Sequence, residues 1–203
     1  MTRLLPAAAI VFALCAPGYA VELDVKFGEG VKLPSSLKWQ RAGITSKHKD
    51  GFNTGNIDAK KQEYLYNLWA KEIAEKDNRG NAVCKNDPRC SFPENLLLAE
   101  FSLNGVTHRF SSASMVYDGC NAGFINDVQE CLWRYESVDE KTGDITHTKS
   151  FRMCANVGFK EDPHPDVLEF AVDDKNSVVY FTVNAKSSGY DLKYLCSAAI
   201  SIK

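Results

Sequence analysis

The sequence predicts a mainly β fold of the α+β class: an antiparallel sheet or two-sheet sandwich of hairpins, with one amphipathic helix and disulfide staples. Three observations lead to this prediction. Several segments alternate apolar and polar residues, and turn residues separate them. One stretch, residues 58–77, places its apolar residues at helical spacing. Six cysteines remain once an N-terminal export signal is removed.

The first 20 residues have the features of a secretory signal peptide. Arg3 is their only charged residue, Leu4–Cys15 is an apolar run, and the small residues Gly18 and Ala20 follow. Small residues at positions −3 and −1 predict cleavage after Ala20. The apolar run of about 12 residues is too short to span a bilayer. A buried N-terminal helix and a lipid anchor remain alternatives, although the bulky Leu14 before a cysteine disfavours the anchor.

The mature chain, residues 21–203, suits a single domain. Removing Arg3 from the 24 basic residues leaves 23 against 26 acidic ones, a net charge of −3. A general nucleic-acid binder needs a basic surface that releases counterions, so the charge argues against that class. No second long apolar run follows the signal, and we therefore expect no transmembrane segment.

The cysteines of the mature chain predict disulfides. An even number of cysteines in an exported chain indicates disulfide bridges. The six cysteines are Cys84, Cys90, Cys120, Cys131, Cys154 and Cys196. Loop closure favours neighbours, which gives the pairs Cys84–Cys90, Cys120–Cys131 and Cys154–Cys196. A bridge from Cys131 to Cys154 across a hairpin is the main competitor.

The stretch from Leu96 to Phe110 carries the strongest hairpin signal. Asn104-Gly105 is a two-residue turn of the kind that joins antiparallel strands. That turn would put an apolar set on one face, namely Leu103 opposite Val106, Phe101 opposite His108 and Ala99 opposite Phe110. It would put a polar, charge-matched set on the other face, namely Glu100 opposite Arg109 and Ser102 opposite Thr107.

Two more hairpins are expected further along the chain. Cys131–Val138 and Ile145–Cys154 flank Lys141-Thr142-Gly143, a three-residue loop with Gly143 left-handed and Trp133 opposite Phe151. Val167–Val172 and Val178–Val183 flank a turn at Asp173–Ser177. Single strands are expected at Val21–Phe27, Leu33–Trp39, Tyr190–Cys196 and near Ile200.

The helix is expected between Asp58 and Asp77. Its apolar stripe consists of Leu65, Leu68, Trp69 and Ile73, with Glu72 falling inside the stripe. Asp58 is placed to cap the first turn, and helix formers fill residues 70–76.

The segment Gln40–Ile57 is expected to be a long loop that contacts a partner. It is polar, contains three glycines and shows no apolar period. It also carries local positive charge on an acidic protein, together with one aromatic residue; the expected partner-binding residues are Arg41, Lys47, His48, Lys49 and Phe52. A solvated linker is the alternative for this segment. The acidic stretch from Glu161 to Asp174 is the other candidate binding surface, because its charge could steer a partner protein.

No motif for chemistry stands out. The chain lacks G-x-S-x-G, HExxH, a phosphate-binding glycine loop and an EF-hand pattern. It has no CxxC and its four histidines are scattered, so no metal and no cofactor are expected. We expect His108 to be a core histidine with a satisfied ring nitrogen, and Cys120 to be a half-cystine rather than a nucleophile.

These observations predict an exported, protein-binding domain rather than an enzyme. The most specific version is an inhibitor or immunity protein that occludes a toxin or hydrolase, in the periplasm or, second, in the secreted fraction. An envelope structural or ligand-binding module is one alternative. A secreted hydrolase that uses His108 with a carboxylate is another.

Overall fold

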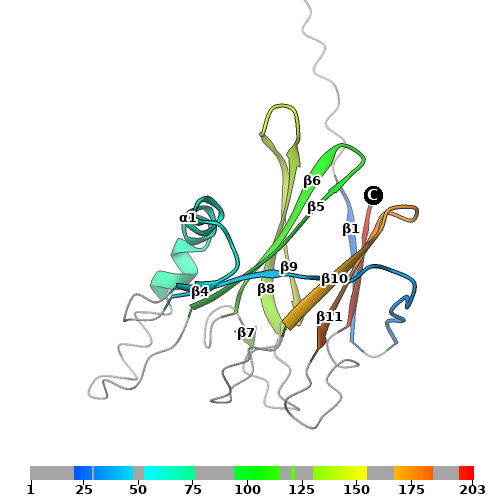
Figure 1. Cartoon of the computed structure of the whole chain (residues 1–203), viewed down its shortest axis with the longest axis horizontal. Coiled ribbons are helices and arrows are strands. Elements are labelled where there is room, and N and C mark those ends of the chain that lie inside the picture. Colours follow the sequence, from blue (N-terminus) through cyan, green and yellow to red (C-terminus); the bar gives the residue numbers. More distant parts are fainter. Residues whose placement is uncertain are drawn as a thin grey trace, which may run out of the picture.

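The computed structural model describes residues 21–28, 30–47, 53–75, 94–114, 120–121, 130–154, 167–184 and 197–203. These residues form two antiparallel sheets that face each other, with a helix on the outer side of one of them (Figure 1). The mainly β, antiparallel architecture predicted from the sequence is therefore confirmed. The expected signal peptide, the 84–90 loop and the strand at Tyr190–Cys196 lie outside the described residues.

The smaller sheet has five strands in the order β1-β12-β11-β10-β2. Its strands are β1 (Leu23–Phe27), β2 (Gln40–Arg41), β10 (Val167–Asp173), β11 (Val178–Asn184) and β12 (Ala198–Ile202). The predicted strands at the N-terminus of the mature chain and near Ile200 are thus β1 and β12, which pair with each other.

The larger sheet has the order β4-β3-β5-β6-β8-β7, and β9 pairs with the other side of β8. Its strands are β3 (Gly43–Lys47), β4 (Asn53–Gly55), β5 (Glu94–Leu103), β6 (Val106–Ser114), β7 (Cys120–Asn121), β8 (Glu130–Asp139) and β9 (Ile145–Cys154). Short β7 pairs with the end of β8 that lies beyond the β6 pairing.

All three predicted hairpins are confirmed, and so are the registers predicted for two of them. In β5–β6, Leu103 pairs with Val106, Phe101 with His108 and Glu100 with Arg109, and the turn residues Asn104 and Gly105 have positive φ angles of 54° and 76°. In β8–β9, Trp133 pairs with Phe151, and Gly143 is left-handed at φ 76°. In β10–β11, the strands run from Val167↔Asn184 to Asp173↔Val178.

The main core lies between the two sheets. Phe110 on β6 and Phe181 on β11 are almost fully buried, and their ring centroids are 5.5 Å apart across the sandwich. Trp133 on β8 lies equally close to Phe181. Each such side chain stabilises the fold by roughly 1.5–3 kcal/mol relative to exposure.

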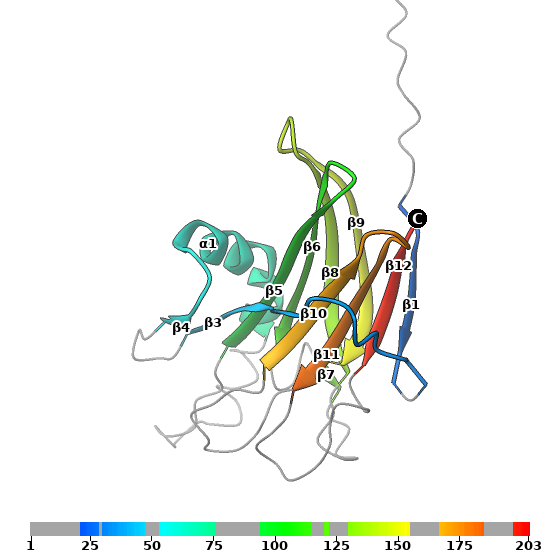
Figure 2. The same cartoon turned by 45° about the vertical axis from the view of Figure 1, so that its right-hand side comes forward.

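A second core lies on the outer face of the larger sheet, under α1 (Ala59–Leu68) (Figure 2). Leu65 and Trp69 are fully buried against Leu96, Leu98 and Ala113 of the sheet, and Leu68 and Ile73 pack against the same cluster. The predicted helix and its stripe are confirmed: the Asp58 side chain accepts a hydrogen bond from the backbone N–H of Lys61 (3.0 Å), and after Trp69 residues 70–75 are again helical. The described residues therefore form three layers: sheet, sheet and helix.

Two sequence predictions are wrong. Residues 33–39, expected to hold a strand, hold none. Gln40–Ile57, expected to be a loop, contains β2, β3 and β4, and β3 pairs with both β4 and β5. The loop prediction failed because β2 belongs to one sheet and β3 to the other, so the chain changes sheets within a few residues and no single face alternates.

Buried residues within Gln40–Ile57 show how the chain passes between the sheets. Ala42, at the crossing, is 5% exposed, and its N–H donates to the carbonyl oxygen of Leu168 (2.8 Å). Gly43 is next, and a Cβ there would lie 2.8 Å from Cγ1 of Ile57. Small residues are therefore required where this edge of the sandwich is closed.

Candidate functional site

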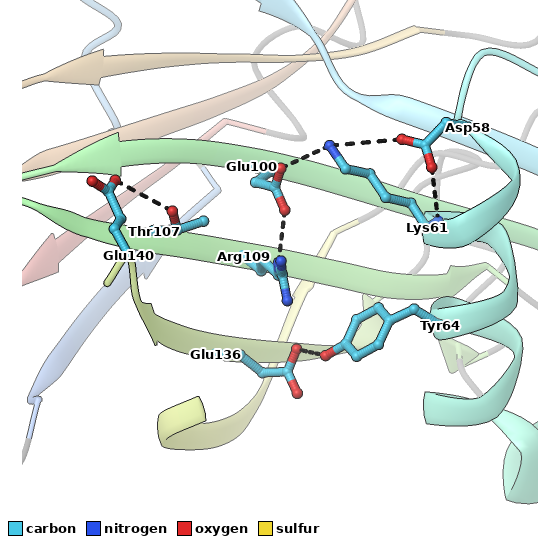
Figure 3. Close-up of polar contacts among 8 residues, drawn as sticks. All are labelled: Asp58, Lys61, Tyr64, Glu100, Thr107, Arg109, Glu136 and Glu140. Carbon is cyan, nitrogen blue, oxygen red and sulfur yellow. Dashed lines mark hydrogen bonds and ion pairs between the residues drawn. The ribbon is translucent and has the colours of Figure 1, made fainter. Parts of the chain in front are cut away.

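A row of charged residues crosses the outer face of the larger sheet beneath α1. Glu100 on β5 is opposite Arg109 on β6, and Arg109 is opposite Glu136 on β8. Lys61 and Tyr64, three residues apart on α1, reach down to this row (Figure 3). We call these five residues, together with the helix cap Asp58, the polar cluster.

In one half of the polar cluster, two cations bind the carboxylate of Glu100. Lys61 Nζ lies 2.8 Å from its Oε1, and Arg109 Nε donates to its Oε2 over 2.6 Å. Burial alone would raise the pKa of Glu100, but the hydrogen bonds from Lys61 and Arg109 outweigh it and hold the pKa below its ordinary value. Glu100 is therefore a carboxylate bound by two cations, which leaves it a poor proton acceptor at neutral pH.

Glu136 and Tyr64 form the other half. Glu136 is only 4% exposed, and its Oε2 accepts a hydrogen bond from the Tyr64 hydroxyl. Burial and, second, the bond to Glu136 raise the pKa of Tyr64 well above its ordinary value. The Arg109 guanidinium carbon lies 5.3 Å from the centre of the Tyr64 ring. The phenol therefore stays protonated and acts as a donor that satisfies a buried carboxylate.

A second polar contact secures the far part of the helical segment. Arg134 on β8 binds Glu72 through Nη2 and Oε1 (2.6 Å), donates to the backbone oxygen of Leu68, and stacks 4.3 Å from the centre of the Trp69 ring. The Trp69 indole N–H in turn donates to Ser111 Oγ (3.2 Å). Glu72, the charged residue within the predicted apolar stripe, is thus buried with a cation as its partner.

The combined arrangement holds a helix on a sheet. Its described carboxylates each have a donor or cation bound to them, and three of these contacts, Lys61–Glu100, Tyr64–Glu136 and Arg134–Glu72, join the helical segment to the sheet. General acid–base chemistry needs a group whose proton is free to move at working pH. In the polar cluster these groups are instead held by the contacts that dock α1 on the larger sheet.

His108 lies on the opposite, inner face of the same sheet. It is 4% exposed, its Nδ1 is 2.8 Å from the Tyr135 hydroxyl, and its ring stacks on Phe101 with centroids 5.4 Å apart. Burial lowers its pKa, and burial also raises the pKa of Tyr135 to about 12. The prediction of a core histidine with a bonded ring nitrogen is confirmed: the bonded group is the phenol of Tyr135.

The expected partner-binding residues are only partly described. Arg41 is exposed on β2, directly opposite Glu169 on β10, so one cation of the expected positive patch sits beside the acidic stretch. Lys47 ends β3 in the other sheet, where it pairs with Glu94 and Asn53. Arg41 and Lys47 therefore belong to different sheets, and His48, Lys49 and Phe52 lie outside the described residues.

Among the cysteines, Cys120, Cys131 and Cys154 fall in described strands. Cys131 is fully buried and disulfide-bonded, and the residue directly opposite it in β7 is Cys120. Cys154 is opposite Glu130, so it does not face Cys131 in the register. Cys84, Cys90 and Cys196 lie outside the described residues, and the pairing of all six stays a prediction.

A search of the described residues found no group of three or more histidine, cysteine or acidic side chains arranged to hold a metal ion. The same residues include no helix with the length and apolar character needed to cross a membrane. Comparison with protein-family models, with curated proteins and with solved structures found no match to this chain.

Sequence reasoning found part of the polar cluster. It placed Glu100 and Arg109 opposite each other on the polar face and Asp58 at the helix cap. It missed Glu136, Lys61 and Tyr64. Their signal was weak: alternate charges at Arg134 and Glu136 on β8, and polar residues three apart on α1.

Proposed function

We propose that this chain is an exported, protein-binding domain, most specifically an inhibitor or immunity protein that occludes a toxin or a hydrolase. One observation carries the proposal: the ionisable groups that are best placed for chemistry are bound to one another across the helix–sheet interface. Side chains used in this way stiffen a scaffold. A rigid scaffold lowers the entropic cost of binding a partner.

The cysteines and the export signal support the same proposal. Three bridges, with Cys120 joined to Cys131 as the β7–β8 register favours, would stiffen the sandwich further. Disulfides persist in the periplasm and outside the cell, where toxins and hydrolases are met. We place the mature protein in the periplasm, with secretion as the second location.

The proposed contact surface is the connection between β3 and β4. It contains His48, Lys49 and Phe52, and it follows Lys47 at the end of β3; Arg41 is exposed on β2, in the other sheet. A cluster of cations with one aromatic anchor is complementary to a carboxylate-lined cleft. A single anchor of this kind is often worth about 2 kcal/mol in an interface.

The test is affinity purification of the mature, oxidised protein from envelope extract of its native host, with identification of whatever binds stoichiometrically. The variant Phe52→Ala/Lys47→Glu/Lys49→Glu should lower affinity for that protein about tenfold or more, mainly through the on-rate. The matched control is Lys141→Glu/Lys175→Glu, which changes two exposed lysines on hairpin turns. Recovery of no stoichiometric protein would contradict the proposed function.

A further inference from the structure

Strand β9 is the longest open edge in the described part of the sandwich. It has 10 residues and pairs with β8 alone, whereas the other strands that have one partner, β1, β2, β4 and β7, have 5, 2, 3 and 2 residues. Proteins usually shorten or cover edge strands because unpaired backbone groups attract other chains. The four short strands follow that rule, and β9 does not.

The backbone of β9 is regular over most of its length. Its pairing with β8 runs without interruption from Glu130↔Cys154 to Ser137↔His147, and the irregularity comes only at the Ser137/Val138 step. In an antiparallel strand every second residue directs its N–H and C=O toward one neighbour, and the residues between direct theirs to the other side. Thr148, Lys149, Ser150 and Arg152 are all exposed along this edge.

The charged side chains of β9 are all basic. The strand contains His147, Lys149 and Arg152 and no acidic residue, on a mature chain whose net charge is negative. Lys149 Nζ donates to the backbone oxygen of Leu23 on β1 (3.3 Å), which holds the ammonium group at the gap between the two sheets with two further donors. Two copies of β9 paired together would bring like charges side by side, so charge disfavours a second copy.

We propose that β9 is a docking edge for an extended segment of a partner protein that carries carboxylate side chains. The segment adds to the larger sheet as a further strand. Backbone hydrogen bonds supply the pairing, and Lys149 and Arg152 select acidic residues. This inference rests on the proposed protein-binding function and assigns it a second surface, apart from the β3–β4 connection.

The experiment uses the mature, oxidised protein labelled for amide NMR and a capped peptide of about ten residues in which pairs of glutamates alternate with pairs of valines. Both faces of the added strand then carry carboxylates, as Lys149 and Arg152 on opposite faces of β9 require. Titration should shift backbone amides of β9 and the facing positions of β8, with a dissociation constant of about 1 mM or tighter. Two peptides test the two parts of the mechanism: one with lysine for glutamate removes the charge match, and one with proline for valine removes the backbone donors. Both should bind at least about tenfold more weakly.

The protein variants complete the design. Lys149→Glu/Arg152→Glu should weaken binding of the glutamate peptide about tenfold or more, and Lys141→Glu/Lys175→Glu should leave it unchanged. If the double variant does not fold, Arg152→Glu alone keeps the test valid, since this side chain is exposed. If Lys149 and the irregularity at Ser137/Val138 serve only to prevent pairing at this edge, no peptide would shift the amide signals of β9. That result would overturn the inference.

Different experimental results would contradict the docking edge and the proposed function. If the native protein recovers a stoichiometric partner and Lys149→Glu/Arg152→Glu recovers it equally well, the docking edge is wrong and the binding function stands. If the native protein recovers none, the binding function is wrong, whatever the peptide does.

Discussion

Glu72 is a carboxylate on the buried side of the helical segment, and its surroundings explain how the fold accommodates it. Arg134 supplies the countercharge at 2.6 Å and covers the Trp69 ring at the same time. A planar guanidinium performs both tasks, and a lysine ammonium would not stack in this way. The other carboxylate oxygen of Glu72, Oε2, is buried and has no hydrogen-bond partner among the described residues, so the carboxylate depends on Arg134.

Arg134→Ala should therefore destabilise the protein by about 2–4 kcal/mol, because it leaves Glu72 buried without its cation and exposes one face of Trp69. Chemical denaturation followed by tryptophan fluorescence measures this change. The control is Lys71→Ala, which removes an exposed 3.8 Å ion pair with Glu75 on the same segment and should leave stability almost unchanged. Equal effects of the two substitutions would show that burial of Glu72 is not what makes Arg134 important.

At the scale of elements, β2 and β3 show how one short segment closes a sandwich. Gln40 and Arg41 pair with β10 in one sheet, and three positions later Ile44 pairs with Leu97 of β5 in the other. The change of sheet takes place at Ala42, which is buried, and Gly43, where a Cβ would collide with Ile57. Edge closure of this kind protects backbone groups that an open sheet would expose.

Gly43→Val should destabilise the protein by about 1–3 kcal/mol, because the new side chain would collide with Ile57, which is only 7% exposed. The preference of valine for strands acts in the opposite direction but spans no more than about 1 kcal/mol. The cost of overpacking should therefore exceed the gain in strand propensity, so the net effect of the substitution should be destabilising.

A double-mutant cycle with Ile57→Ala tests the cause of this effect. The penalty for Gly43→Val, measured from denaturant midpoints, should shrink in the Ile57→Ala background because the colliding atoms are gone. An undiminished penalty in that background would mean that the backbone rather than Ile57 demands glycine.

At the scale of the whole molecule, two cores and one polar interface hold three layers together. The aromatic core lies between the two sheets, and the smaller core and the polar cluster (Figure 3) lie between the larger sheet and α1. The layers are joined by contacts between distant parts of the chain: Lys61 and Glu100 are 39 positions apart, and Tyr64 and Glu136 are 72 apart. Bridges between cysteines would add covalent links to this assembly.

The mature, oxidised protein should contain no free thiol. Alkylation under denaturing conditions followed by mass mapping should find Cys120 linked to Cys131, the residues that face each other in β7 and β8. Reduction should lower the melting temperature markedly, since each bridge contributes about 2–4 kcal/mol. Two or more alkylated cysteines in unreduced protein would contradict the three-bridge arrangement, and a Cys131–Cys154 peptide would contradict the pairing.

The sequence by itself determined the local features of this protein. The Asn104-Gly105 turn and strict alternation set the β5–β6 register, and the Asp58 cap with its apolar stripe set the helix, because each depends on residues close together in the chain. Only the tertiary structure decided the change of sheet at Ala42–Gly43 and the row formed by Glu100, Arg109 and Glu136 beneath α1. These features depend on which strands become neighbours and where the helix docks. Such choices are made by burial and ion pairing between segments tens of residues apart, and they leave no periodic signal in any one segment.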